Sequence, residues 1–193
     1  MPSFQINGVH HLALVCADME RTVEFYTHTL GMRLTKGFDL EGYGQHFFFD
    51  MGNGSELAFF WFNDAADAQP GIASAGNIVG RAGPTISSAH GSMNHLAFNV
   101  DKDDIVEYRE RLISKGVDCS PLVNHNDVVT GEESRTAKTA SEKTWLQSFY
   151  FFDPDGVMLE FCATLQPGIE HADLPVNAAG LKANGQPVTG MTV

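Results

Sequence analysis

The sequence predicts an α+β fold built from two tandem βαβββ modules. A short strand-like stretch that has a histidine at or next to its start and leads into a helix occurs twice, at residues 10–15 and 94–98. Further strand-like runs follow each copy along the chain. A repeat this long indicates a duplicated module rather than a solenoid, whose units span about 20 to 50 residues. We expect the two sheets to form one cupped, barrel-like metal site with the helices outside.

The composition excludes several classes of partner. The chain has 193 residues, of which 43% are hydrophobic, and a formal net charge of −12. A chain of this length buries roughly 70% of its unfolded surface, so it needs no disulfide to hold a core. An acidic surface repels phosphate groups and anionic lipids. We therefore expect neither a nucleic acid nor a membrane as partner.

The cysteines indicate a reducing compartment. There are three of them, Cys16, Cys119 and Cys162, and an odd number in apolar or strand-like contexts suits buried thiols better than a disulfide framework. The N-terminus lacks a basic segment followed by an apolar run, and no window is apolar enough to span a membrane. We expect an unprocessed protein of the cytoplasm.

The first module is predicted at residues 8–62. In the strand at 10–15, His11 shares one face with small residues, and the bulkier apolar face is expected to lie beneath a helix. That helix begins after Asp18, which is a suitable N-cap, and ends at Gly31. Glycine-containing turns then separate three strands, predicted at 32–40, 45–50 and 56–62.

The second module is predicted at residues 94–165, after a linker at 63–93. Its expected elements are a helix at 103–115, a strand at 117–123, a polar insertion at 124–143, and a hairpin of strands at 145–152 and 157–164. We interpret the insertion as a lid, because a long loop in a compact domain is more often functional than inert. The tail, 166–193, is rich in proline and glycine and predicts extended chain over this subunit or a neighbour.

Three side chains are candidate metal ligands: His11, His95 and Glu160. Any one of them alone would more often be an ordinary strand residue. The two histidines, however, occupy equivalent positions of the repeat, and a glutamate in the middle of an apolar strand is costly to bury without a cation. Two imidazoles and one carboxylate leave up to three positions open on a metal, as in non-haem Fe(II) oxygenases.

These motifs resemble the vicinal oxygen chelate superfamily, which includes glyoxalase I, fosfomycin-modifying transferases, bleomycin-binding proteins and extradiol ring-cleaving dioxygenases. The resemblance rests on His-Leu-Ala-Leu, His-Leu-Ala-Phe and the Asp-Pro-Asp-Gly turn before Leu-Glu-Phe, and it covers about residues 8–165. It implies His11, His95 and Glu160 as ligands. A fourth ligand of glyoxalase I would fall on Ala58, which favours the three-ligand branches, although Glu56 takes that role if the register shifts by two.

Within the superfamily, residues 150–160 are similar to the extradiol dioxygenase signature Tyr-x-x-Asp-Pro-x-Gly-x-x-x-Glu. The resemblance implies that Tyr150 hydrogen-bonds near a metal-bound catecholate. The alternative is that Tyr150 is one more aromatic residue in an aromatic strand. The full signature also has a histidine shortly before the tyrosine, and residues 141–147 contain none.

An acid–base histidine upstream of the second ligand is not matched at its usual spacing. We take His90 for this role, with His46 and His125 as alternatives, although any one of the three would more often be an ordinary solvent-exposed loop or strand histidine. An apolar wall for the substrate is expected from four phenylalanines of the first module: Phe47, Phe49, Phe60 and Phe62.

The leading functional hypothesis is therefore an Fe(II) extradiol-type dioxygenase of aromatic catabolism, which takes a catechol-like diol and O₂ and forms a homo-oligomer. A second hypothesis is an isomerase, epimerase or thiol transferase that uses Mn, Ni, Co or Zn as a Lewis acid. A third is a small-molecule binding protein that keeps the fold without a metal.

Overall fold

The α+β class and the two tandem βαβββ modules are confirmed, with one additional short strand, β7, at the edge of the second sheet. The computed structural model describes residues 4–77, 86–127 and 136–168. The first module contains β1 (His11–Val15), α1 (Met19–Glu24), the π-helical segment η1 (Phe25–Thr29), β2 (Leu34–Leu40), β3 (Gly44–Gly52) and β4 (Ser55–Phe62). The second contains β5 (Leu96–Asn99), α2 (Ile105–Ser114), β6 (Val123–Asn126), β7 (Thr136–Ala137), β8 (Thr144–Phe152) and β9 (Met158–Thr164).

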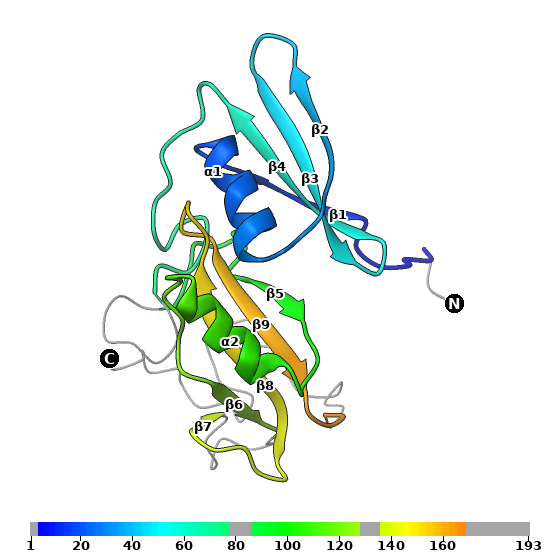
Figure 1. Cartoon of the computed structure of the whole chain (residues 1–193), viewed down its shortest axis with the longest axis vertical. Helices are drawn as coiled ribbons and strands as arrows, with labels where there is room; N and C mark the ends of the chain where they lie inside the picture. The colour runs from blue at the N-terminus through cyan, green and yellow to red at the C-terminus, as the bar shows by residue number, and fades with distance from the viewer. Residues whose placement is uncertain (1–3, 78–85, 128–135, 169–193) are drawn as a thin grey trace.

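The strands form two separate sheets, which Figure 1 shows one above the other. The first sheet has the order β1-β4-β3-β2, and the second has the order β5-β9-β8-β6-β7. In each sheet the strand that opens the module pairs parallel with the strand that closes it. No strand of one sheet pairs with the other within the described residues, so a single copy does not close a barrel.

The first helix forms as its sequence predicts and then widens. Asp18 caps it, because its side chain accepts a hydrogen bond from the Arg21 N–H at 3.0 Å. From Phe25 the turns become π-helical, and the Leu30 N–H donates to the Phe25 carbonyl. Gly31, at φ 77°, ends the segment in the left-handed region that glycine adopts without strain.

The second helix is also close to its prediction, but the strand after it is not. The strand expected at 117–123 is wrong in position, since β6 begins only at Val123. Pro121 has no N–H to donate to a ladder, and Ser120 instead bonds Tyr150 of β8 through its N–H and its hydroxyl. The ends of the polar insertion form β6 and β7, while its centre, 128–135, lies outside the described residues, as does the tail from 169.

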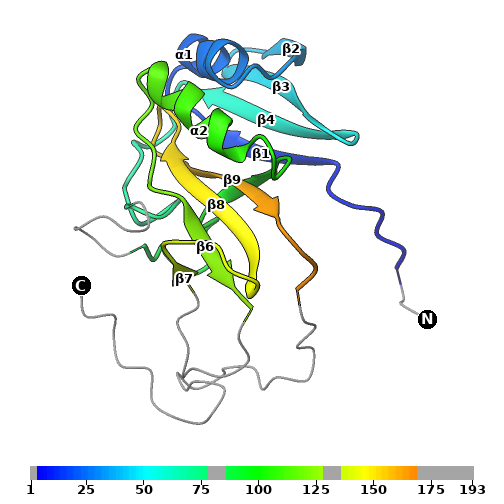
Figure 2. The same cartoon turned by 60° about the horizontal axis from the view of Figure 1, so that its bottom comes forward.

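The core lies between the modules and draws on both of them. Strand alternation directs Leu12 and Leu14 inward from β1, and Leu159 and Phe161 inward from β9. The helices cover these inner faces and lie on the same side of the molecule (Figure 2). They meet at their ends, where Lys115 Nζ donates to two carbonyls of η1 at 2.7 and 2.8 Å. The other face of each sheet points away from this core and carries the polar residues discussed below. On the second sheet, part of that face is covered by Ala75, which packs against Tyr150 and Met158. We call these two faces the open faces.

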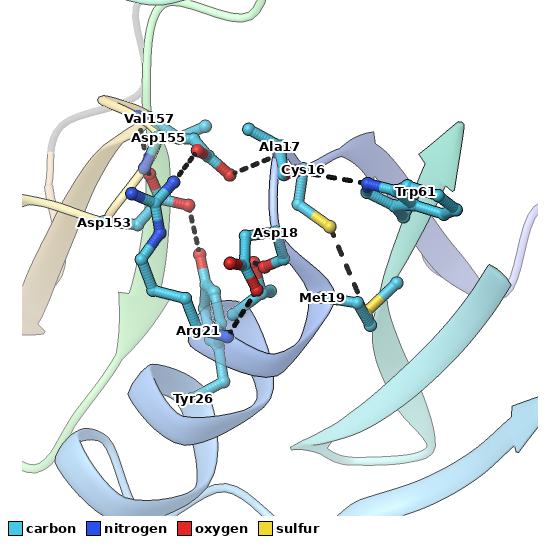
Figure 3. Close-up of polar contacts among 11 residues, drawn as sticks. Cys16, Ala17, Asp18, Met19, Arg21, Tyr26, Trp61, Asp153, Asp155 and Val157 are labelled. Carbon is cyan, nitrogen blue, oxygen red and sulfur yellow. Dashed lines mark hydrogen bonds and ion pairs between the residues drawn. The ribbon is translucent and has the colours of Figure 1, made fainter. Parts of the chain in front are cut away.

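The β8–β9 turn holds the two modules together (Figure 3). Asp155 accepts hydrogen bonds from the Ala17 N–H at 3.0 Å and from the Arg21 guanidinium. The neighbouring Asp153 is 6% exposed and accepts a hydrogen bond from the Tyr26 hydroxyl at 3.1 Å. We call these four side chains, Arg21, Tyr26, Asp153 and Asp155, the inter-module clamp. The clamp fixes the hairpin that carries Tyr150 and Glu160 against the segment that follows β1.

Candidate metal centre

Two of the predicted ligands meet on the open face of the second sheet. His95 immediately precedes β5, and Glu160 lies in the adjacent strand β9, where it pairs in register with Ala97. The imidazole Nε2 of His95 lies 3.0 Å from the Glu160 Oε2. The His95 side chain is 36% exposed, whereas the Glu160 side chain is 5% exposed. The pair thus has a buried carboxylate beneath a partly accessible imidazole.

Asn94 determines which nitrogen of His95 carries hydrogen. The Asn94 amide nitrogen donates to the Ile86 carbonyl at 2.9 Å, so its oxygen is the atom that faces His95. That oxygen lies 2.8 Å from His95 Nδ1, which must therefore be the protonated donor. In the neutral ring, Nε2 then has a lone pair and no hydrogen.

This arrangement fits a cation. A lone pair on His95 Nε2 faces a carboxylate oxygen of Glu160, and two acceptors at this separation repel unless a proton or a metal lies between them. Imidazole nitrogen and carboxylate oxygen are both ordinary ligands of divalent transition metals. An outer hydrogen bond from the other ring nitrogen, as Asn94 accepts here, is the usual support of a metal-binding histidine.

The Glu160 carboxylate is held in its ionised form. Burial raises its pKa, but hydrogen bonds from Ser148 and Tyr150, and the contact with His95 when Nε2 carries a proton, outweigh burial and leave the pKa below the ordinary value. An ionised carboxylate is the form that binds a metal.

Three further polar side chains surround the pair: Ser148 and Tyr150 from β8, and His125 from β6. Tyr150 pairs in register with Glu160, so the two lie side by side on one face. His125 Nε2 lies 2.9 Å from the Ser148 hydroxyl and 3.4 Å from the Tyr150 hydroxyl. Burial lowers the pKa of His125 and raises that of Tyr150. The cluster therefore combines a neutral imidazole with a protonated phenol beside the candidate ligands.

His11 lies on the other sheet. It is exposed on the open face of the first sheet, where its ring meets His10 and Phe48. Within one copy, the described part of the chain brings no three His, Cys, Asp or Glu side chains together in a group that could hold a metal. The structure thus joins His95 to Glu160 but does not join His11 to them.

The strand register places Ala58 at the position where the resemblance to glyoxalase I would put a fourth metal ligand. Glu160 pairs with Ala97, and the equivalent pair in the first sheet is Ala13 with Ala58. Glu56 pairs with His11 instead, and its carboxylate accepts a hydrogen bond from the Thr35 hydroxyl at 2.6 Å. No shift by two residues occurs, so Glu56 does not take the place that corresponds to Glu160.

The three histidines considered for acid–base chemistry have different positions. His125 belongs to the cluster around Tyr150. His90 is exposed in the turn before β5, and none of the cluster's hydrogen bonds involves it. His46 lies on the first sheet, 7% exposed, with Nδ1 3.0 Å from the Phe59 carbonyl. The structure therefore brings His125 to the site rather than His90.

Two residues of the site were not predicted. Ser148 stands two positions before Tyr150 in the same strand, so the alternation of β8 could have revealed it. Asn94 gave no such signal, because its role depends on the contact with Ile86, which only the folded chain brings close.

The fold defines a protein of tandem βαβββ modules, each with one open sheet face. A family model described as "Glyoxalase/Bleomycin resistance protein/Dioxygenase superfamily" matches residues 8–161. The chain belongs to this superfamily. The superfamily expected from the motifs is thereby confirmed.

Individual relatives are more distant. The Bacillus subtilis (strain 168) protein YwkD, described as uncharacterized, is 27% identical over 156 residues, which cover 80% of this chain and 95% of the relative. A glyoxalase family protein from Enterococcus faecalis has a TM-score of 0.55 at 23% identity, with 81% of this chain and 97% of that chain covered. The fosfomycin resistance protein FosX from Listeria monocytogenes, complexed with Mn(II) and sulfate, has a TM-score of 0.51 at 20% identity, with 83% and 96% covered. The two solved structures share the fold of this chain.

No helix in the described ranges has the length and apolar character that crossing a bilayer would need.

Proposed function

We propose that this protein is a metal-dependent enzyme whose metal is bound by His95 and Glu160 of one copy and by His11 of a second copy. The observation that carries the proposal is the 3.0 Å approach of His95 Nε2 to Glu160 Oε2 while Asn94 holds the proton on the other ring nitrogen. The donor set, two neutral imidazoles and one carboxylate, suits a divalent transition metal.

The open sheet faces support a homodimer. His11 and the cluster around Glu160 lie on different sheets, and each open face is turned away from the core that the modules share. Two copies related by a twofold axis would place the first sheet of each copy against the second sheet of the other. Two identical sites would result.

The leading reaction is extradiol-type cleavage of a catechol-like diol, in which both atoms of O₂ enter the product and a ring bond beside the diol breaks. When bound, a divalent metal would polarise two neighbouring substrate oxygens, and iron(II) would in addition allow reaction with O₂. His125 is the base that accepts a diol proton at Nε2. Tyr150 donates a hydrogen bond to the substrate oxygen, and Ser148 orients the imidazole.

The free thiols support a reducing compartment such as the cytoplasm for this enzyme. All three cysteines are unbridged, and two of them, Cys16 and Cys119, are buried.

The test is reconstitution without oxygen. Protein stripped of metal is loaded with Fe(II), its iron content is measured, and a panel of catechols is added under air. The expected result is a yellow ring-opened product and consumption of about one O₂ per diol. Full iron occupancy without product over the whole panel would exclude the dioxygenase. Conversion of a substrate by the Mn, Ni, Co or Zn protein without O₂ would instead identify a Lewis-acid isomerase, epimerase or transferase.

The binding-protein alternative has a separate readout. If the protein only sequesters a ligand, His11→Ala leaves its affinity for that ligand unchanged and the wild type retains no metal. If it is an enzyme, the same substitution removes metal and activity together.

Asn94→Ala should weaken metal binding without removing a ligand. The substitution frees His95 Nδ1 from its acceptor, so the ring can rotate or carry hydrogen on the metal-binding nitrogen. We expect a loss of roughly 10- to 100-fold in affinity, measured by competition with a chelator. Asn99→Ala, exposed at the end of β5, the strand that follows Asn94 and His95, is the matched control and should retain wild-type affinity. An unchanged affinity in Asn94→Ala would contradict the role of Asn94.

A further inference from the structure

The open face of the first sheet carries a connected series of aromatic rings. We call this series the aromatic ladder, and its members are Phe38, Tyr43, His46, Phe48, Phe60 and Phe62. Phe48 lies 4.3 Å from His46 between ring centroids, and His46 stacks on Phe60 at 3.6 Å with the ring planes 1° apart. Phe60 stacks on Phe62 at 5.2 Å. The ladder therefore crosses the face without interruption.

The ladder is not part of the hydrophobic core. The core takes Phe47, Phe49 and Phe59, which alternate with ladder residues along β3 and β4 and point to the helices. The expectation that Phe47 and Phe49 line a substrate pocket is therefore wrong, because strand alternation turns them to the opposite face. Phe38 and Tyr43 of the ladder are 41% and 54% exposed, Phe48, Phe60 and Phe62 are half-buried, and His46 is buried among them.

One end of the ladder is adjacent to a proposed metal ligand. The His11 ring contacts Phe48 at 5.9 Å in a T-shaped arrangement. At the other end, Tyr43 stacks on Phe62 at 6.4 Å. A substrate whose oxygens reached a metal on His11 would lay the rest of its atoms first over Phe48 and then toward Phe60.

We infer that the aromatic ladder binds a planar, unsaturated substituent of the substrate, such as a second ring fused or joined to the oxygen-bearing one. The inference rests on the proposed metal site, because that site fixes the position of the substrate oxygens. Continuity between His11 and the ladder is the reason to assign this surface to substrate. A monocyclic catechol would reach Phe48 alone, while a larger ring system would also contact Phe60. Aromatic pairs add affinity beyond the apolar area that they bury.

The first test uses metal-stripped wild-type protein, so it does not depend on turnover. Catechol, naphthalene-2,3-diol and the saturated cyclohexane-1,2-diol are titrated, and binding is followed by calorimetry. We expect naphthalene-2,3-diol to bind roughly 10-fold more tightly than catechol, and the saturated diol to bind most weakly. Equal affinity for the saturated and the aromatic diols, or no binding of either aromatic diol, would overturn the inference.

The second test separates near and far positions of the ladder. Phe60→Leu keeps the side chain apolar but removes its ring. We expect it to lower the affinity for naphthalene-2,3-diol roughly 3- to 10-fold and to leave the affinity for catechol unchanged. Phe4→Leu is the control, because Phe4 is 81% exposed in the segment before the first sheet. Equal losses for both ligands in Phe60→Leu would mean general damage to the surface and would overturn the inference.

The two proposals fail in different ways. If metal-stripped protein binds naphthalene-2,3-diol more tightly than catechol but the iron-loaded protein cleaves neither, the ladder proposal stands and the dioxygenase proposal is rejected. Cleavage of monocyclic catechols, with no preference for the larger ring, would retain the dioxygenase and reject the ladder.

Discussion

Mixing two inactive variants, His11→Ala and His95→Ala, should restore about a quarter of wild-type activity and metal content. In the proposed dimer each site takes His11 from one copy and His95 from the other. A mixed dimer therefore has one site with both defects and one site with none. Random reassortment makes about half of the dimers mixed, and each of these has one intact site of two. Either variant alone should lose activity by at least about 100-fold, because a protein ligand is missing.

The measurement requires co-refolding or co-expression of the variants, followed by metal analysis and an activity assay. The control is a mixture of His95→Ala with Glu160→Ala. These two residues lie on the same sheet, so every site in the mixed dimer lacks one ligand and no recovery is expected. Recovery in the control, or its absence in the first mixture, would show that the site is not shared between copies in this way.

Asp153→Asn should stabilise the protein at neutral pH. Burial raises the pKa of Asp153 to about 6 from 3.8, and repulsion from Asp155 adds to the rise, while hydrogen bonds from Val157, Tyr26 and Asp155 oppose it. Because the folded state favours the protonated carboxyl, the stabilising contribution is complete below about pH 4. It is lost as the pH rises through about 6. A pKa shift of this size corresponds to a change in the free energy of unfolding on the order of 3 kcal/mol between the protonated and the ionised form of Asp153.

Asparagine resembles the protonated carboxyl in this turn. Its oxygen can accept the two backbone hydrogen bonds that Asp153 Oδ1 accepts from Asp155 and Val157. Its amide nitrogen would donate to the Tyr26 hydroxyl oxygen, as a protonated Oδ2 would. We therefore expect denaturant unfolding of Asp153→Asn to show a gain of about 1 to 3 kcal/mol at about pH 7.5 and little gain at about pH 4.

Asp50→Asn is the contrasting variant. A backbone hydrogen bond from Gly52 and the Arg33 guanidinium hold the pKa of Asp50 below its usual value. The stabilising contribution of Asp50 is therefore present at neutral pH and is lost as the pH falls. Asp50→Asn should accordingly lower the stability at neutral pH, whereas Asp153→Asn should raise it. A loss of stability in Asp153→Asn at every pH would mean that the inter-module clamp needs the ionised carboxylate.

Local rules in the sequence were sufficient for most of the fold. Asp18 and Gly31 bound the first helical segment, and alternation in β1 and β9 correctly separated the core-facing residues from the open faces. The one displaced strand, β6, depended on a contact between Ser120 and Tyr150, which are distant in sequence. The strand propensity of residues 117–122 carries no information about that contact.

The candidate site divides in the same way. The repeat gave His11 and His95, and the hairpin motif gave Tyr150 and Glu160, because each belongs to a short pattern. The choice of His125 over His90 depended on which strand lies next to β8, and strand order is a property of the whole sheet.

By itself the sequence determined the superfamily, the duplicated module and the face on which each polar residue lies, since these follow from periods of a few residues and from the repeat. Only the tertiary structure decided that His95 and Glu160 meet while His11 lies on another sheet, and that Asn94 sets the proton of His95. The physical reason is that such contacts depend on how the modules pack around their shared core. That packing is encoded by many weak interactions between distant residues rather than by any one motif.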